Sequence, residues 1–364
     1  MKNTIRFGAI AAASALVLAA CASAPEDEPA SSDTAGGTET EAPVETVDYK
    51  ACMVSDQGGF DDASFNESAY DGLVRASEEL GIETAEAEST AESDYGPNLQ
   101  AQVDEGCDLI ITVGFLLSGA TVEAALANPD VNFAIIDDLA DNDFDGEIDA
   151  PNIKPITFET DEASFLAGYA AASASTTGTL GTFGGLEIPS VTIFMDGFLS
   201  GANYFNEETG GDVAVLGWGD SGASFVGNFE DAPAGQNITQ GFLDQGADIV
   251  MPVAGPVGLG AASAIQSAGD AWMIGVDSDW TESAPEYADI MFTSVLKQIS
   301  NAVYDTIETS LEGFSTDPYV GTLENEGVGI ADFAEGTVDD ETLAALEEIR
   351  AGIIAGEIEP SAAG

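Results

Sequence analysis

Between a short apolar run and a segment of helical periodicity stands the sequence Asp56-Gln57-Gly58-Gly59-Phe60-Asp61-Asp62-Ala63-Ser64-Phe65-Asn66. The apolar run at residues 51–55 predicts a strand, and the apolar residues between 70 and 80 recur at helical spacing. The paired glycines allow a sharp turn, and Ser64 or Asn66 can cap the helix. Because ligands bind at the carboxyl ends of strands in open α/β sheets, the pattern predicts a binding loop. The alternative is a solvated Asp-rich turn, since Asp, Gly and Ser dominate ordinary turns.

Strand and helix patterns alternate along the chain on both sides of residue 160. Strands are predicted at residues 50–55, 82–86, 108–113, 132–137, 179–183, 213–217, 248–252 and 272–276, and helices at residues 67–80, 95–105, 119–127, 162–174, 188–206, 235–245 and 258–268. Such alternation indicates parallel sheets with crossover helices. For a chain of 364 residues, it predicts two α/β lobes.

The last third of the chain contains more elements than the second lobe needs. An apolar strand is predicted at residues 290–296 and a helix at residues 298–311, followed by an extended ribbon and an amphipathic closing helix at residues 339–355. We therefore expect the chain to return to the first lobe through a three-segment hinge. The expected N-terminal lobe comprises residues 47–157 plus about 290–364, and the C-terminal lobe residues 158–289.

The first residues have the layout of an export signal. Lys2 and Arg6 precede an apolar run at residues 7–20, which ends in Leu18-Ala19-Ala20-Cys21. This pattern predicts a lipoprotein signal peptide at residues 1–20, cleavage before Cys21 and acylation of its thiol. A plain secretory signal with a chance cysteine is the alternative. Residues 21–46 contain almost no large apolar side chain, which predicts a disordered tether that leaves the protein lipid-anchored on the extracytoplasmic membrane face.

The charge balance is strongly acidic. Seven Lys and Arg residues stand against 66 Asp and Glu, for a net charge of −59. Nucleic-acid binding is disfavoured because phosphate contacts need clustered basic residues. Such self-repulsion requires counterion screening, so we hypothesise a salty habitat, which a melting midpoint insensitive to added sodium chloride would exclude.

Two cysteines remain beside Cys21. Cys52 and Cys107 each stand at the start of a predicted strand, and the first and third strands are neighbours in the doubly wound order 2-1-3. Disulfides persist in exported proteins, so a bridge between these residues is the favoured prediction. Two buried free thiols are the alternative.

Most catalytic constellations lack their parts in this sequence. It contains no histidine, no nucleotide-binding Gly-Lys-Ser/Thr loop and no cysteine pair at zinc spacing, so we predict neither an enzyme nor a cofactor. The pairs Asp61-Asp62 and Asp137-Asp138 have side chains suited to Ca²⁺ binding or acid–base catalysis, but a solvated acidic face explains them more simply. Residues 255–260 depart from the dinucleotide fingerprint and predict a turn that brings backbone amides close to a neutral ligand.

Lys297 is unusual because a chain with few basic residues keeps it directly after an apolar strand, at the predicted hinge. A surface lysine without function is the alternative.

The Asp56–Asn66 loop resembles the signature of the basic membrane protein (BMP) family, PnrA-like purine-nucleoside-binding lipoproteins of ABC importers. Five further stretches resemble family blocks in family order: Gly106-Cys107-Asp108-Leu109-Ile110-Ile111-Thr112-Val113-Gly114-Phe115, Phe133-Ala134-Ile135-Ile136-Asp137, residues 255–260, Ile274-Gly275-Val276-Asp277-Ser278-Asp279 and Thr293-Ser294-Val295-Leu296-Lys297. The resemblance spans roughly residues 50–314. It implies the type I periplasmic-binding-protein fold, an α/β architecture of two doubly wound parallel-sheet lobes with a three-segment hinge.

Carried over position by position, the resemblance implies a ligand pocket without catalytic or metal-binding residues. From the first loop, Asp56 would be a hydrogen-bond acceptor, Phe65 a stacking ring and Asn66 a polar contact. Asp137 would accept a hydrogen bond from the base, and Phe229 would be the opposing stacking ring. Gly255 would supply a backbone contact, and Asp277 and Lys297 would contact the ribose. Core packing is the alternative for both rings, and the block around Phe229 matches less well. Trp218 and Trp280 are alternative aromatic walls.

The resemblance implies a purine nucleoside, such as inosine, guanosine or adenosine, as ligand and an ABC permease in the membrane as partner. Stacking on aromatic rings suits a base, and carboxylates accept bonds from ribose hydroxyls. One lysine among several aspartates cannot neutralise a phosphate dianion, so we expect nucleotides to be rejected. The rivals are a binding protein for a sugar or signalling molecule on the same fold, an exported Ca-dependent nucleoside hydrolase and a structural surface lipoprotein.

Overall fold

The computed structural model describes residues 46–361, which belong to one compact unit. The predicted signal peptide, the lipidation site Cys21 and nearly all of the tether lie outside the described residues. Among residues 46–361, no helix combines the length and the apolar character that crossing a bilayer requires.

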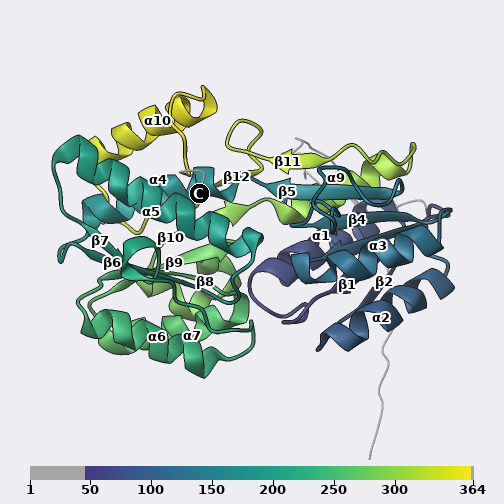
Figure 1. Ribbon diagram of the computed structural model, residues 1–364, viewed down its shortest axis with the longest axis horizontal. Coiled ribbons are helices and arrows are strands. Elements are labelled where there is room, and N and C mark those ends of the chain that lie inside the picture. The colour runs from purple at the N-terminus through teal and green to yellow at the C-terminus, as the bar shows by residue number, and fades with distance from the viewer. Residues whose placement is uncertain (1–45, 362–364) are drawn as a thin grey trace, which may run out of the picture. The chain divides into compact units, whose positions relative to one another are not determined.

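The first sheet is wholly parallel and has helices on both faces (Figure 1). Its strands are β1 (Lys50–Ser55), β2 (Glu83–Ala87), β3 (Leu109–Val113), β4 (Asn132–Ile136), β5 (Ile153–Phe158) and β11 (Tyr319–Gly321). They lie in the order β11-β5-β4-β3-β1-β2. The helices of this lobe are α1 (Phe65–Leu80), α2 (Glu92–Asp104), the short η1 (Phe115–Leu117), α3 (Ser118–Ala127) and α9 (Ile299–Ser310).

Strand β1 shows why this sheet is covered on both sides. Alternate side chains of a strand point to opposite faces. Ala51 and Met53 pack in the cluster that includes α1 and α9, whereas Cys52 and Val54 pack in the cluster that includes α2 and α3. All four side chains are fully buried, so β1 reads as a continuous apolar run.

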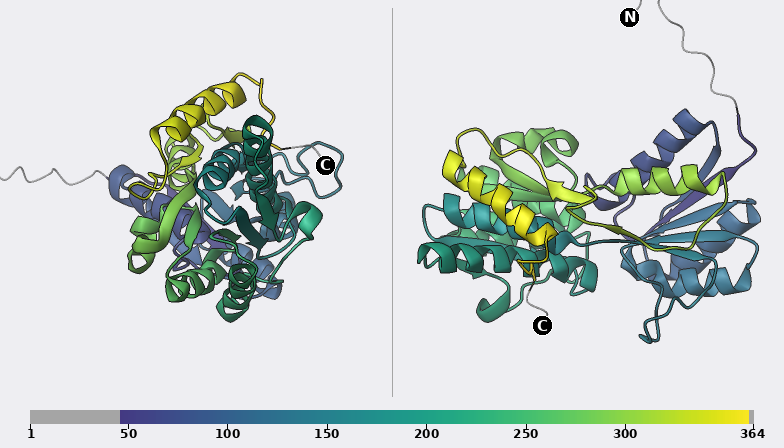
Figure 2. Two further views of the ribbon diagram at one scale, coloured as in Figure 1. Left: turned by 90° about the vertical axis from the view of Figure 1, so that its left-hand side faces the viewer. Right: turned by 90° about the horizontal axis from the view of Figure 1, so that it is seen from above.

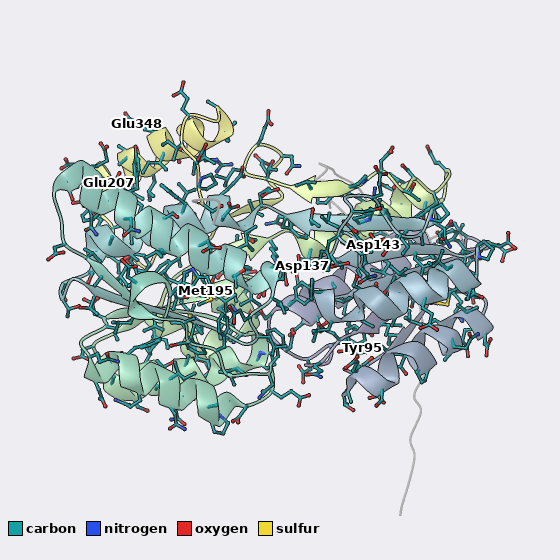
Figure 3. All side chains as sticks on the ribbon, viewed as in Figure 1. Tyr95, Asp137, Asp143, Met195, Glu207 and Glu348 are labelled. Carbon is teal, nitrogen blue, oxygen red and sulfur yellow. A yellow bond between two sulfur atoms is a disulfide. The ribbon has the colours of Figure 1, made fainter. Side chains whose placement is uncertain are left out.

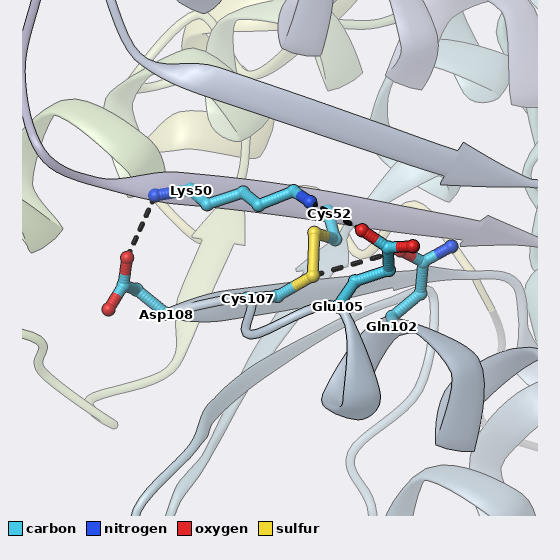
Figure 4. The surroundings of a disulfide bond; sticks show 6 residues. All are labelled: Lys50, Cys52, Gln102, Glu105, Cys107 and Asp108. Carbon is cyan, nitrogen blue, oxygen red and sulfur yellow. Dashed lines mark hydrogen bonds and ion pairs between the residues drawn. A yellow bond between two sulfur atoms is a disulfide. The ribbon is translucent and has the colours of Figure 1, made fainter.

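A disulfide joins Cys52 of β1 to Cys107, two residues before β3 (Figure 4). The two strands are hydrogen-bonded neighbours, and the Cα atoms are 5.9 Å apart. The bridge favoured by the sequence is therefore present. Beside it, the Lys50 side chain is 3.0 Å from Glu105, and the Lys50 backbone N–H donates to Asp108 at 2.8 Å.

The second sheet repeats the order of the first. Its strands are β6 (Thr179–Gly184), β7 (Ala214–Leu216), β8 (Ile249–Val253), β9 (Trp272–Asp277), β10 (Met291–Lys297) and β12 (Val328–Ile330). They lie in the order β12-β10-β9-β8-β6-β7, and only the edge strand β12 runs antiparallel to its neighbour β10. The helices are α4 (Thr160–Ala174), α5 (Pro189–Thr209), α6 (Ala232–Asp244), α7 (Gly258–Ala268), α8 (Trp280–Ser283) and α10 (Asp340–Ile354), with short turns η2 (Gly219–Ser221), η3 (Gly255–Val257) and η4 (Pro285–Ile290).

Helices α4 and α5 cover one face of the second sheet, and α6 and α7 the other (Figure 1). Three close approaches explain the tight α4–α5 pair. A Cβ on Gly168, Gly197 or Gly201 would collide with the backbone of the opposite helix. Helix α10 packs on α4, so the described chain ends beside the second sheet (Figure 2).

The expected lobe boundary near residue 290 is wrong for the strands. Strand β10 pairs with β9, and β12 pairs with β10, so both belong to the second sheet. Only α9, which packs on α1, and β11, which pairs with β5, return to the first lobe. An apolar run buried on both faces cannot reveal which sheet it joins. The chain still crosses three times, between β5 and α4, between β10 and α9, and between β11 and β12.

Candidate functional site

A cavity lies between the two lobes and is lined by residues from both. It encloses about 540 Å³ of space, including the space at its open mouth. Its lining contains all eight residues that the sequence predicted for ligand binding: Asp56, Phe65, Asn66, Asp137, Phe229, Gly255, Asp277 and Lys297. Residues separated by up to 241 positions in the chain are thus brought together at the carboxyl ends of the strands.

Asp56 follows β1 and lines the cavity together with Asn66, the second residue of α1. The Asn66 Nδ2 donates to Asp56 Oδ1 at 3.1 Å, and both residues are buried. Burial raises the pKa of Asp56 to about 8, although the Asn66 donor opposes this shift. Asn66 Oδ1 is buried without a hydrogen-bond partner. An unpaired acceptor in a cavity wall requires a donor, which a ligand can supply.

The cap of α1 differs from the expectation. The side chains of Ser64 and Asn66 do not cap the helix; Asp62 accepts the backbone N–H groups of Ser64, Asn66 and Glu67 at 2.9 to 3.1 Å. Burial raises the pKa of Asp62 to about 6 against these donors. Capping by Asp62 leaves the Ser64 hydroxyl free for other contacts, whereas the Asn66 amide donates to Asp62 Oδ2 at 3.3 Å as well as to Asp56.

Lys297 ends β10 and meets one aspartate from each lobe. Its Nζ donates to Asp137 Oδ2 at 2.5 Å and lies 3.7 Å from Asp277 Oδ1. All three side chains are buried. Burial raises the pKa of both aspartates, and the Lys297 ammonium opposes that shift. Lys297 is buried and pairs with two carboxylates, so the alternative of a surface lysine is wrong.

Asp137 and Asp277 occupy equivalent places in the two lobes. Asp137, which Figure 3 labels, directly follows β4, and Asp277 ends β9. These strands hold the third position in their sheets. Both have positive φ, 65° and 69°. Non-glycine residues in this conformation store strain that the surrounding structure must balance.

Two half-buried rings enter the cavity from opposite lobes. Phe65 is the first residue of α1, and Phe229 lies in the loop before α6. The Phe229 ring sits against Gly185, where a Cβ would overlap its Cδ1 and Cε1 atoms. The alternative aromatic walls are wrong: Trp280 is fully buried in the second lobe's core, and Trp218 packs edge-on against Phe225 outside the cavity lining.

Three contributors to the site were missed by the sequence. Phe194 of α5 lines the cavity with its ring centroid 5.0 Å from Lys297 Nζ, and Phe65 is 5.2 Å away. Gly114 has φ of 113° and leaves no room for a Cβ beside the Asp56 carboxylate. Gly185 makes room for Phe229 in the same way. The two glycines directly follow β3 and β6, a position that signals their role, whereas Phe194 resembles any apolar residue inside a helix.

The comparison with protein families decides what kind of protein this is. A family model described as "ABC transporter substrate-binding protein PnrA-like" matches residues 49–359. The chain belongs to the PnrA-like BMP family.

Relatives of this BMP-family chain carry matching names. It is 31% identical to "ABC transporter nucleoside-binding protein BmpA" of Lactococcus lactis subsp. cremoris over 98% of each chain. It is also 36% identical to "Basic membrane protein A" of Borreliella burgdorferi, over 70% of each chain. Among solved structures, a solute-binding protein of an ABC transporter system from Aeropyrum pernix K1 aligns with a TM-score of 0.76 and 26% identity, over 85% of this chain and 92% of that one.

The BMP-family chain is therefore an ABC transporter substrate-binding protein of the type I periplasmic-binding fold. Proteins of this class are extracytoplasmic and deliver a solute to a membrane permease.

The acidic pairs of this BMP-family protein divide between cavity and surface. Asp138 accepts from the Ser118 hydroxyl and the Ala140 backbone N–H, and Asp61 is exposed. A different group, Asp141, Asp143 and Asp149, brings carboxylate oxygens within 4.8 Å of one another on an exposed loop. None of these three residues lines the cavity between the described lobes.

Proposed function

We propose that this substrate-binding protein captures a purine nucleoside between its lobes and presents it to an ABC permease. The observation that carries this proposal is the composition of the cavity. It combines one half-buried ring from each lobe with a buried Lys–Asp–Asp cluster. A flat heterocycle joined to a polyhydroxylated sugar has matching chemistry at its two ends.

At the base end, Phe65 and Phe229 would stack on the two faces of the purine. Stacking on an aromatic side chain contributes about 1 to 3 kcal/mol per base. Asn66 Oδ1 and the Asp56 carboxyl group would act as acceptors, and ring N–H or amino groups of a purine are donors that would pair with them. Gly255, with φ of 52°, would bring the backbone close to the ligand.

At the sugar end, Asp277 and Lys297 would hold ribose hydroxyls. Asp137 was expected to accept a bond from the base, but its ion pair with Lys297 favours the sugar end. The carboxylates accept from hydroxyls and the ammonium donates to them, so a diol satisfies both partners. A ligand without the hydroxyls would leave buried charged groups unpaired, which penalises its binding.

We further propose that the mature protein is a lipoprotein anchored through Cys21 on the extracytoplasmic face. The support is the sequence Leu18-Ala19-Ala20-Cys21 after an apolar run with basic residues before it. Substituting Cys21→Ser should move the protein from the membrane fraction to the soluble fraction of expressing cells. Wild-type protein found equally in the soluble fraction would contradict the anchor.

Calorimetry with inosine, guanosine, adenosine and free ribose tests the ligand. We expect at least one nucleoside to bind at least 100-fold more tightly than ribose, because only nucleosides use the stacking rings. Ribose binding as tightly as a nucleoside would instead favour a sugar-binding protein. Release of free base from inosine in the presence of Ca²⁺ would indicate a hydrolase. Absence of any nucleoside binding would refute the proposal.

A further inference from the structure

A short turn of the first lobe is hydrogen-bonded directly to the second lobe at the edge of the cavity. Ser64 Oγ donates to Asp277 Oδ2 at 2.9 Å and approaches the Val276 carbonyl at 3.2 Å. The preceding carbonyl, that of Ala63, accepts from two second-lobe hydroxyls, Ser278 Oγ at 3.1 Å and Ser283 Oγ at 2.8 Å. Two consecutive residues thus contact the end of β9 and helix α8.

The turn is shaped for this contact. Ala63 has φ of 53°, a conformation that costs energy in a residue with a Cβ, and its methyl group packs against the core of the second lobe. Asp62 holds the turn from the first-lobe side by accepting three backbone N–H groups. Ser64 is almost fully buried although it belongs to a loop that ends at a cavity. A strained and buried turn persists only where its surroundings stabilise it.

These contacts join protein groups to protein groups, so they stabilise the closed lobes without ligand. They also reach Asp277, whose second oxygen lies 3.7 Å from Lys297 in the cavity. The Ser64 hydroxyl holds Oδ2, which turns Oδ1 toward the site.

We propose that the Ala63-Ser64 turn is an interlobe clasp, which holds a closed population of the ligand-free protein and positions Asp277 when the lobes meet. A ligand that binds only the closed form loses affinity in proportion to the fraction of protein that is open. The clasp therefore increases affinity for every ligand of the site by the same factor. Ser64 adds a second, selective effect because it orients one sugar-binding carboxylate.

The clasp is tested first without any ligand. Spin labels on cysteines at Leu126 of α3 and Gln240 of α6, both exposed, report the distance between the lobes of the full-length protein. We expect a closed population in the wild type and, in Ser278→Ala/Ser283→Ala, a roughly 5- to 30-fold lower ratio of closed to open molecules, because two hydrogen bonds are lost. Ser267→Ala, an exposed hydroxyl of α7 that donates to Ser263, is the matched control and should leave the distances unchanged.

An unchanged distance distribution in the double variant, or a wild type that is entirely open without ligand, would overturn the clasp. If the double variant does not fold, Ser283→Ala alone is measured, and its ratio of closed to open molecules should be about fivefold lower than in the wild type. This experiment uses no nucleoside, so its outcome does not depend on the proposed ligand.

The positioning role of Ser64 rests on the proposed function and has its own measurement. Ser64→Ala should reduce the preference for inosine over 2′,3′-dideoxyinosine by about tenfold, whereas Ser278→Ala/Ser283→Ala should weaken both ligands equally. Ser64→Thr retains the hydroxyl and should restore the preference. If Ser64→Ala weakens the binding of both ligands equally, Ser64 belongs to the clasp but does not position Asp277.

Discussion

In the first lobe Asp137 directly follows β4, and in the second lobe Asp277 ends β9; these strands hold the third position in their sheets, and both residues have positive φ. The strands in the fifth position differ. After β1 the first lobe places the buried carboxyl group of Asp56, whereas after β6 the second lobe places Gly185, against which Phe229 rests. The first lobe thus offers Asp56, Asp137 and the Phe65 ring, and the second offers Asp277, Lys297, apolar walls and backbone.

This difference between equivalent loops teaches how one architecture makes an asymmetric site. The strand order brings the same loop positions to the cavity from both sides. The residues at those positions are free to differ because loops carry little of the core. A ligand held by both lobes must therefore be chemically asymmetric, and each lobe can be tested separately.

Removing the cation that joins the two aspartates should have the largest effect. Lys297→Met leaves Asp137 and Asp277 buried without their cationic partner, so we expect destabilisation of about 3 to 5 kcal/mol and at least a 100-fold loss of nucleoside affinity. Thermal melting and calorimetry measure these effects. Lys154→Met, which removes a partly exposed lysine that donates to the Asp317 carbonyl, is the control. A Lys297→Met protein as stable and as tight-binding as this control would contradict the assigned cluster.

The two rings should contribute similar amounts from opposite lobes. Phe65→Ala and Phe229→Ala are each expected to cost about 1 to 3 kcal/mol in nucleoside binding, the value of one stacked face. Leucine at either position retains apolar volume without a π face and should recover only part of the loss. Calorimetry measures the nucleoside affinity of each variant. A loss of affinity in only one of the two variants would show that the base is stacked on a single lobe.

The buried carboxyl of the first lobe should make stability depend on pH. The pKa of Asp56 is about 8 when folded, above the usual carboxyl value, so the folded state keeps a proton that the unfolded chain has released. Its contribution to stability is present below about pH 4 and is lost as pH rises toward 8, by at most about 1.4 kcal/mol per pH unit. The melting temperature should fall less between pH 5 and 8 in Asp56→Asn than in wild type. Exposed Asp61→Asn is the control, and identical slopes in all three proteins would disprove the assignment.

The smallest effect is expected from the glycine that makes room for the second-lobe ring. Gly185→Ala should displace Phe229 and weaken nucleoside binding by about tenfold, no more than one stacked face contributes. Gly241→Ala, in α6 where a Cβ meets open space, is the matched substitution. If Gly185→Ala binds the nucleoside as tightly as Gly241→Ala does, nucleoside binding does not depend on the observed position of Phe229.

Most elements were predictable because their signals are local. The run Ala51-Cys52-Met53-Val54-Ser55 predicted β1, and the observed strand is Lys50–Ser55. The alternating strands and helices predicted two lobes, which the two sheets bear out. The cavity residues were reached through the resemblance to a family, because residues as distant as Asp56 and Lys297 carry no mutual signal in one sequence. Where the resemblance ended, as at Phe194 and Gly185, the site was missed.

The sequence alone determined the elements, the acidic surface and the residue types available to a site, because periodicity and composition depend only on neighbours along the chain. The tertiary structure decided that β10 joins the second sheet, that Asp62 and not Ser64 caps α1, and that Lys297 meets two aspartates in a buried cluster. Strand pairing, desolvation and charge pairing depend on groups that meet only after folding. They are properties of three-dimensional neighbours, which no local pattern encodes.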